Sequence, residues 1–301
     1  MRSGKLLSLV GILVWTAVAL TAWPHTIAYR HAVTVSVQDD APAASCSDLH
    51  MEFDGREAVR QSEEKTISTT EASPLRIQAH SNGGLQVEGW AEKGYMVTLC
   101  KGADPNSDAQ ALLSQIHLNF QGGELTVSGP ASHNRWSAHL LVHAPPGAAM
   151  ELSAHNGPVS LYAVNGSLKI HTENGPITVS ECSGELELSA HNGPVTLRGN
   201  RGKLNVRTEN GPVTLSLNGT TWDGPGLEAR AQNGPVSIRI PSGYQSGVLV
   251  ESEGHGPFQC QASICSEGRK TWWEEDVKRI EFGNGPAVIR VSTVNGPVSV
   301  D

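Results

Sequence analysis

The chain has 301 residues and a formal net charge of −8, and only 5% of its residues are aromatic. An acidic chain repels nucleic acid and anionic membrane surfaces, so neither is expected to attract it by charge. It contains 32 glycines but only 4 phenylalanines, a composition that disfavours one bulky globular core and favours many thin layers of Val, Leu and Ile between turns.

The N-terminal segment, residues 1–23, has the composition of an export signal. Arg2 and Lys5 precede an uncharged, mostly apolar run at residues 6–23, which is long for a signal peptide and just long enough to span a membrane as a helix. Ala17-Val18-Ala19 offers a cleavage site, whereas Trp23 at the far edge favours an uncleaved anchor. We expect an N-terminal apolar helix, kept as an inner-membrane anchor or removed, and an exported chain in the periplasm or on the cell surface.

Changes in composition divide the rest of the chain into three parts. Residues 24–64 are rich in Pro, Ala, Ser and charged residues, as in a linker with a polar lead-in. Residues 65–149 contain short alternating apolar runs and form an N-terminal β part. Residues 150–301 carry a repeat and are expected to end in a cap.

The N-terminal β part is predicted from period-two alternation. Strands are expected at Leu75–Ala79, Leu85–Gly89, Tyr95–Leu99, Ile116–Phe120, Glu124–Ser128 and Ser137–His143. Asn82-Gly83-Gly84 is expected to form a tight turn between the first two strands. The polar stretch 104–108 resembles a helix start, so one short helix is expected near residues 105–115. Trp90 and Trp136 are expected in the core.

The triplet Asn-Gly-Pro recurs at a fixed spacing of eighteen residues. The regular copies are Asn156-Gly157-Pro158, Asn174-Gly175-Pro176, Asn192-Gly193-Pro194 and Asn210-Gly211-Pro212. The triplet returns at irregular spacings at Asn233, Asn284 and Asn295, and as His255-Gly256-Pro257. A short fixed period means that one structural unit is stacked on itself.

Each eighteen-residue unit splits into two halves of nine residues, each a turn followed by one short alternating run. Apolar residues then align in columns, such as Val159, Ile177, Val195 and Val213. Because only one side of each run is apolar, two sheets should face each other across a narrow core. The sequence therefore predicts an all-β fold, a two-sided parallel β-solenoid or β-helix with 18-residue coils.

The Asn-Gly-Pro triplets are predicted to be the structural corners of these coils. Asn and Gly tolerate the left-handed backbone angles that a sharp corner can require. Pro suits the first position of the following strand, where the ladder only begins. Coils stack about 4.8 Å apart, so the corner asparagines are expected to form an amide ladder.

A longer period of thirty-six residues is superimposed on the repeat. Residues 153–159 are identical to residues 189–195, and the residue before each corner Asn alternates between His and Glu. These residues are His155, Glu173, His191 and Glu209. The two histidines would lie roughly 9–10 Å apart, too far to share one zinc ion. We expect a charge ladder that fixes register, with a weak metal site as the alternative, and we expect no cofactor.

The chain contains five cysteines. In an oxidising compartment Cys260 and Cys265 are expected to pair, and Cys46 with Cys100 is the next candidate pair. Cys182 would then be left over, either as a small buried residue or as a reactive thiol.

An aromatic and acidic patch stands out near the C-terminus, at Trp272, Trp273, Glu274 and Asp276. Stacked tryptophans with carboxylates can hold sugars, so this is a candidate ligand patch. Alternatively, this segment and the insertion before it cover an open end of the solenoid.

Catalytic signals are weak. No nucleophile-elbow, zinc-protease or phosphate-loop motif occurs, and residues 151–217 contain no Asp. Glycan-cleaving β-helices need clustered carboxylates. We therefore expect a protein without catalytic residues, although a site could be assembled from scattered residues.

The export segment, residues 81–90, the Pro145-Pro146-Gly147 turn and the serial Asn-Gly units together resemble the bacterial putative-adhesin family of β-solenoid domains. The resemblance covers roughly residues 74–301 and implies the fold without identifying an active site. This chain departs from the family in the Pro after nearly every Asn-Gly and in the Cys-bearing insertion near residues 260–270.

Three functions follow as hypotheses. The first is an exported, membrane-anchored solenoid whose flat faces bind an envelope or surface ligand, a glycan or a protein, or act as a scaffold. The second is a polysaccharide-active enzyme that uses the irregular region 220–285. The third is an envelope element that self-associates end to end.

Overall fold

The computed structural model describes residues 33–37, 42–81, 83–131, 134–254, 256–261, 263–273 and 277–301, with the backbone alone for residues 33–37, 272–273 and 277. The apolar helix predicted for residues 6–23 lies outside these residues. Within them, none of the helices has the length and apolar character that crossing a membrane requires.

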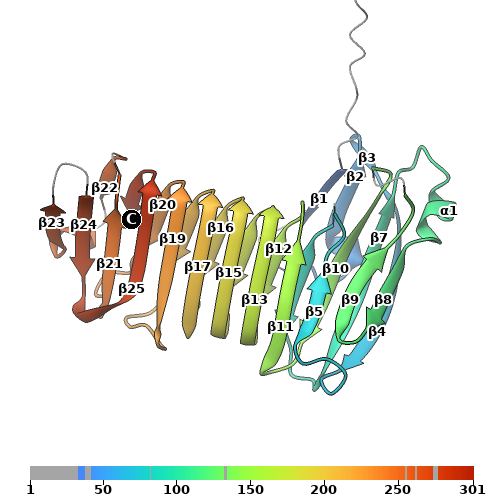
Figure 1. Cartoon of the computed structure of the whole chain (residues 1–301), viewed down its shortest axis with the longest axis horizontal. Coiled ribbons are helices and arrows are strands. Elements are labelled where there is room, and N and C mark those ends of the chain that lie inside the picture. Colours follow the sequence, from blue (N-terminus) through green and yellow to red (C-terminus); the bar gives the residue numbers. More distant parts are fainter. Residues whose placement is uncertain are drawn as a thin grey trace, which may run out of the picture. The chain divides into compact units, whose positions relative to one another are not determined.

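The described chain is predominantly β-structure and is built on two large sheets (Figure 1). In spatial order, the larger sheet contains β23 (Arg269–Trp273), β24 (Val277–Phe282), β21 (Ser246–Ser252), β25 (Asn284–Asn295), β19 (Gly226–Asn233), β17 (Lys203–Asn210), β15 (Ser183–Asn192), β13 (Asn165–Asn174), β11 (Ala148–Ala154), β5 (Leu75–Gln78), β9 (Glu124–Ser128) and β8 (His117–Gln121). The smaller sheet contains β22 (Phe258–Cys260), β26 (Val298–Val300), β20 (Val236–Arg239), β18 (Val213–Ser216), β16 (Val195–Arg198), β14 (Ile177–Ser180), β12 (Val159–Tyr162), β6 (Leu85–Gly89), β10 (Trp136–Ala144), β7 (Gly94–Ala103) and β4 (Val59–Ser68).

The register of the parallel strands follows the eighteen-residue period of the sequence. Val159 pairs with Ile177, Ile177 with Val195, and Val195 with Val213 in the smaller sheet. In the larger sheet Leu168 pairs with Leu186 in the same way. Each repeat unit therefore contributes one strand to each sheet, an arrangement compatible with a β-helix-like fold.

One hydrophobic core lies between the two sheets. The apolar columns of both sheets belong to the same buried cluster, and residues such as Val159 and Leu161 are fully buried. Their alternating neighbours face outward, as the period of two within each strand requires. Each layer needs only small aliphatic side chains, which explains why so few aromatic residues suffice.

The glycines of the stacked Asn-Gly-Pro corners are required by close stacking of the backbone. A left-handed angle is found at Gly285, with φ of 73°, in the triplet that lies outside the asparagine ladder. A Cβ on Gly175 would lie 2.2 Å from the carbonyl oxygen of Gly157, and one on Gly193 would lie 2.3 Å from that of Gly175. None of the described corner asparagines has a positive φ. The expectation that these asparagines adopt a left-handed conformation was wrong.

The left-handed position lies at the opposite end of the short strands instead. Ala163, Glu181 and Gly199 follow one another at the eighteen-residue spacing, with φ of 51°, 56° and 60°. Each of these residues directly follows the last residue of a short strand, which is β12, β14 or β16. Two of these three residues carry a side chain, so the sequence gives little warning of the turn there.

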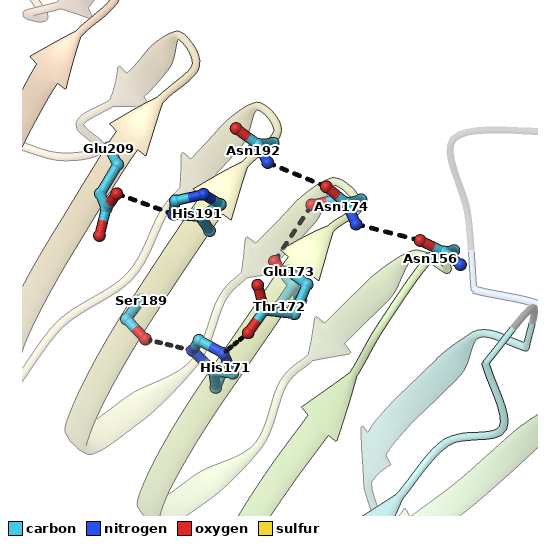
Figure 2. Close-up of polar contacts among 10 residues, drawn as sticks. Asn156, His171, Thr172, Glu173, Asn174, Ser189, His191, Asn192 and Glu209 are labelled. Atoms are coloured by element: carbon cyan, nitrogen blue, oxygen red, sulfur yellow. Dashed lines mark hydrogen bonds and ion pairs between the residues drawn. The ribbon is translucent and has the colours of Figure 1, made fainter.

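The asparagines form the predicted amide ladder along the corner (Figure 2). Each side-chain amide donates to the carboxamide oxygen of the asparagine one coil before it, at distances of 2.9–3.1 Å. The ladder runs through Asn156, Asn174, Asn192, Asn210, Asn233 and Asn295. Asn284 lies at the start of β25 and is not one of its members.

Replacing Asn192 by Ala should destabilise the protein by about 1–2 kcal/mol, because two ladder hydrogen bonds are lost. The free energy of unfolding in urea measures this change. Asn218→Ala, at an exposed loop position, is the matched control and should change stability by less than about 0.5 kcal/mol. Equal effects of the two substitutions would contradict a stabilising ladder.

The stack begins earlier in the sequence than the regular repeat. Leu85 of β6 pairs with Val159 of β12, and Leu75 of β5 pairs with Met150 of β11. Because β5 and β6 lie in different sheets, the segment between them is a coil corner and not the predicted hairpin turn. Gly83 confirms this role, since a Cβ on Gly157 would lie 1.9 Å from the Gly83 carbonyl oxygen.

The segment interpreted as a linker and lead-in contains a small sheet of β1 (Val33–Val37), β2 (Leu49–Phe53) and β3 (Arg56–Glu57). Leu49, Met51 and Phe53 alternate with polar residues and form a second buried cluster, which includes Cys100 of β7. This alternation was overlooked in the sequence. A disulfide between Cys46 and Cys100 joins the lead-in to the smaller sheet.

The N-terminal end of the core is closed by antiparallel strands and by the short helix that the sequence predicts. This helix, α1 (Ala109–Leu113), begins after Asp108, whose carboxylate accepts a hydrogen bond from the Ala111 amide at 3.2 Å. Leu113, Ile116 and the fully buried Trp136 fill the core there.

The C-terminal end is closed by a 3₁₀ helix, Ser263–Ser266, and by the predicted disulfide between Cys260 and Cys265. Ile264 and Cys265 are buried in the same core cluster as the coils. The insertion near residues 260–270 therefore acts as a cap, the structural alternative considered for it.

The order of the last coils differs from their order in the sequence. β25 lies between β19 and β21, and β26 lies between β20 and β22. The last coil of the chain, residues 284–301, is therefore inserted between two coils that precede it (Figure 1).

Candidate functional site: a groove across the larger sheet

The outward side of the larger sheet carries a row of polar side chains in register, here called the donor row. Its members are Gln78, Ser153, His171, Ser189, Arg207 and Arg230. They come from β5, β11, β13, β15, β17 and β19, which are consecutive in the sheet. The row has hydrogen-bond donors at every position and no carboxylate.

A second row on the same face alternates in charge, and we call it the charge row. Its members are Arg76, Glu151, Lys169, Glu187, Asn205 and Glu228. Arg76 and Glu151 form an ion pair at 3.0 Å. Opposite charges on neighbouring strands favour the observed register.

The face is hollowed along these rows. One hollow of 610 Å³ is lined by Ser153, Lys169 and Ile170, among others, and a second of 690 Å³ is lined by Glu209 and Arg230, among others. His171, Ser189 and Arg207 line both. The two hollows therefore form one groove that crosses the strands, and we use this name for it below.

The His and Glu residues beside the corner form pairs, as Figure 2 shows. His171 contacts Glu173 at 2.9 Å, and His191 contacts Glu209 on the next strand at 2.7 Å. The other ring nitrogen of His171 lies 2.8 Å from the Ser189 hydroxyl. The hydrogen bond between His171 and Glu173 lowers the pKa of the Glu173 carboxyl. The pair His191–Glu209 belongs to the predicted column, whereas His171 and Glu173 lie on the same strand, β13, and their contact does not fix register.

The weak metal site of one His and one neighbouring Glu stays a prediction. The part of the chain that is described holds no group of three or more His, Cys, Asp or Glu side chains suited to a metal ion. His171 contacts Glu173 on its own strand, and His191 contacts Glu209 on the next strand.

The predicted ligand patch falls on the edge strand β23. The backbones of Trp272 and Trp273 pair with Lys278 and Val277 of β24. The side chains of both tryptophans lie outside the described residues, as do Glu274 and Asp276. The patch therefore stays a prediction.

Trp90 differs from its predicted place in the core. It is half-buried, its ring is stacked on His143 with centroids 5.2 Å apart, and its indole N–H donates to the Gly94 carbonyl oxygen at 2.8 Å. Its polar edge explains this place, because a buried indole needs a partner for its N–H.

Cys182 is fully buried, and burial raises the pKa of its thiol to about 11. Its backbone amide donates to the side chain of Asn200 at 2.9 Å. The structure thus favours the small buried residue over the reactive thiol.

Native protein should contain one free thiol that alkylates roughly 100-fold more slowly than an unperturbed cysteine at the same pH, because the raised pKa leaves little thiolate. Iodoacetamide labelling followed by intact mass measures the rate. Denaturant should expose one thiol without a reductant and five with it. Fast labelling of native Cys182 would revive the reactive alternative.

The groove includes residues that sequence analysis did not select, such as Arg207, Arg230 and Gln78. Their signal was present in the polar columns of the repeat. It was weak because only the three-dimensional register shows that these columns lie side by side.

Comparison with known proteins finds no matching protein family and no matching curated protein. Several solved structures are similar. They include a putative adhesin from Parabacteroides distasonis, with 10% identity, a TM-score of 0.34, and 80% of this chain and 97% of that one covered. A putative cell adhesion protein from Clostridium sporogenes has 14% identity, a TM-score of 0.31, and 80% and 99% coverage. At these scores the likeness supports no statement about function.

Proposed function

We propose that the protein is an exported β-solenoid that binds an envelope or surface ligand through the groove across its larger sheet. The observation that carries this proposal is the continuity of the two hollows through His171, Ser189 and Arg207. The groove lies on consecutive parallel strands, so its side chains are held by a rigid scaffold.

Export is supported by the disulfides. Cys46–Cys100 and Cys260–Cys265 are both formed, and disulfides persist in oxidising compartments outside the cytoplasm. We propose that residues 6–23 hold the chain at the inner membrane. Fractionation before and after removal of these residues tests the anchor, since the shortened chain should become soluble.

The binding test compares two exposed arginines on opposite faces. Arg207 lies in the groove, whereas Arg198 faces outward from the smaller sheet. Full-length Arg207→Gln should lose most of the binding to isolated cell-envelope material, measured by cosedimentation, and Arg198→Gln should retain it. Equal binding by both variants would place the ligand elsewhere and contradict the proposal.

We further propose that the protein is not a glycan-cleaving enzyme. A glycan-cleaving general acid needs a raised pKa. In the groove His171 lowers the pKa of Glu173. Release of reducing ends from cell-wall or plant polysaccharides, abolished in Glu274→Ala/Asp276→Ala, would overturn this proposal.

End-to-end self-association is the less favoured alternative. Trp136 and Leu113 fill one end of the core, and Ile264 and Cys265 fill the other. The apolar layers at both ends are thus covered by the chain itself. Light scattering over a wide concentration range tests this, and filaments would support the alternative.

A further inference from the structure

We infer that the groove binds an extended β-1,4-linked glycan, laid across the strands with one disaccharide for every two coils. The inference rests on the proposed function, because it names the ligand of the same groove. Its starting point is the longer period of the sequence. Residues 153–154 on β11 and residue 155 after it recur as the identical residues 189–191 on β15, while β13 between them carries a different set.

This period gives the groove its shape. Along the donor row small Ser153 and Ser189 alternate with large His171 and Arg207. Both serines line the first hollow, and Ser189 also lines the second. Strands lie about 4.8 Å apart, so these two small positions lie roughly 9.6 Å from each other. The alternation ends at Arg230 on β19, which follows Arg207 in register.

The period distinguishes between classes of linear ligand. An extended peptide repeats its facing side chains every 6.6–6.8 Å or so, and it loses register with the groove by about 3 Å after one period. In a β-1,4-linked glycan each sugar is turned over relative to the one before. The same edge therefore recurs once per disaccharide, a length close to two strand spacings.

The charges narrow the glycan further. A uniformly anionic polymer would meet Glu151 and Glu187 of the charge row at the same period. A cationic polymer would meet Lys169 and Arg207. Alternating charges with an interleaved Ser153 hydroxyl and Gln78 amide instead suit hydroxyl and acetamido groups. The ligand class is therefore a neutral or N-acetylated β-1,4 glycan.

The length of the groove sets the length of glycan that it can hold. Its lining extends from Gln78 on β5 to Arg230 on β19. This distance is five strand spacings, roughly 24 Å, which accommodates about four to five sugars. The described linings of both hollows contain no aromatic residue. Binding thus depends on hydrogen bonds, each of which improves affinity by roughly fivefold.

Calorimetric titration of the full-length protein with β-1,4-linked N-acetylglucosamine oligomers tests the inference. Two added sugars supply at least two hydrogen bonds, so the tetramer should bind roughly 30-fold more tightly than the dimer. The hexamer should gain little more. An α-1,4-linked glucose tetramer of the same length, whose chain coils, should bind at least roughly tenfold more weakly than the N-acetylglucosamine tetramer.

Ser189→Arg fills one small position and should abolish the gain from dimer to tetramer. Its matched control, Ser216→Arg on the outward side of the smaller sheet, should leave that gain intact. Circular dichroism confirms that both variants are folded. If Ser189→Arg does not fold, Ser189→Asn replaces it, with Ser216→Asn as control.

Tighter binding of heparin, of an extended peptide or of the α-linked tetramer would overturn the ligand class. Arg207-dependent binding to envelope material without binding to any β-1,4 oligomer would refute this inference and leave the proposed function standing. If Arg207→Gln and Ser189→Arg both keep their binding to envelope material and to the β-1,4 oligomers, the inference and the proposed function are both refuted.

Discussion

Gly175→Ala should destabilise the protein by about 3 kcal/mol, because its added methyl group has no space between neighbouring coils. The Cβ would lie 2.2 Å from the carbonyl oxygen of Gly157, which is backbone and cannot rotate away. Separating the two coils would stretch the ladder hydrogen bonds on both sides of the corner. Urea denaturation at neutral pH measures the loss.

The matched control is Gly243→Ala. Gly243 has a φ of +73°, and an added Cβ there would meet no atom within 4 Å. Gly243→Ala introduces the backbone strain of a left-handed alanine but no steric clash, so it should lower the free energy of unfolding by about 1–2 kcal/mol. A smaller loss at Gly175 than at Gly243 would mean that conformational freedom, and not the contact between coils, explains the corner glycines.

Lowering the pH from 7 to 4 should remove about 3 kcal/mol of stability through His139 alone. This side chain lies fully buried on β10, where its ring occupies the space above the backbone of Gly84. Neither ring nitrogen has a hydrogen-bond partner among the described residues. Burial without a partner lowers the pKa of the imidazole from 6.5 to about 4.

The sign follows from proton binding. Between pH 6.5 and 4 the unfolded chain binds a proton at His139 and the folded chain does not, so stability falls as the pH falls. The contribution is fully present above pH 6.5 or so and is lost below about 4. Urea midpoints measured across this range, at constant ionic strength, record the change.

His139→Leu keeps an apolar group of similar size and should flatten this part of the pH profile. His117→Leu, at an exposed position on β8, is the control and should keep the profile of the unmodified protein. A wild-type profile that is flat from pH 7 to 4 would show that His139 is solvated or partnered in solution.

The strands and their register were predictable because two independent patterns in the repeat indicate them. The eighteen-residue spacing aligns Val159, Ile177 and Val195, and the alternation within each half fixes which side is buried. The short helix and the Cys260–Cys265 disulfide were predictable from local signals. Propensity and burial agree in all these elements, so no tertiary information was needed.

The order of the coils was not predictable, for a physical reason. Successive coils present nearly identical corners and apolar columns, so any coil can stack on any other with similar energy. The sequence therefore does not tell that β5 and β6 belong to the stack or that β25 lies beside β19. Only the caps and the irregular loops decide between these arrangements.

The groove was harder to predict than the fold. Sequence analysis selected the corner triplets, which are structural, and the pair Trp272 and Trp273, whose aromatic character stands out. Arg207 and Ser189 stand out in no single repeat. They become a candidate site only because Arg207 pairs in register with Ser189 and with Arg230 on neighbouring strands.

The inserted last coil has a consequence for how the chain is made. During synthesis from the N-terminus, β21 and β22 leave the ribosome before the strands that separate them from β19 and β20. Until residues 284–301 are synthesised, β21 and β22 either stay unpaired on that side or pair with β19 and β20. In the second case β25 and β26 later displace them. Residues 284–301 thus act as a donor strand supplied in cis, and a nascent chain that ends before them would offer a vacant slot to the same segment of another copy.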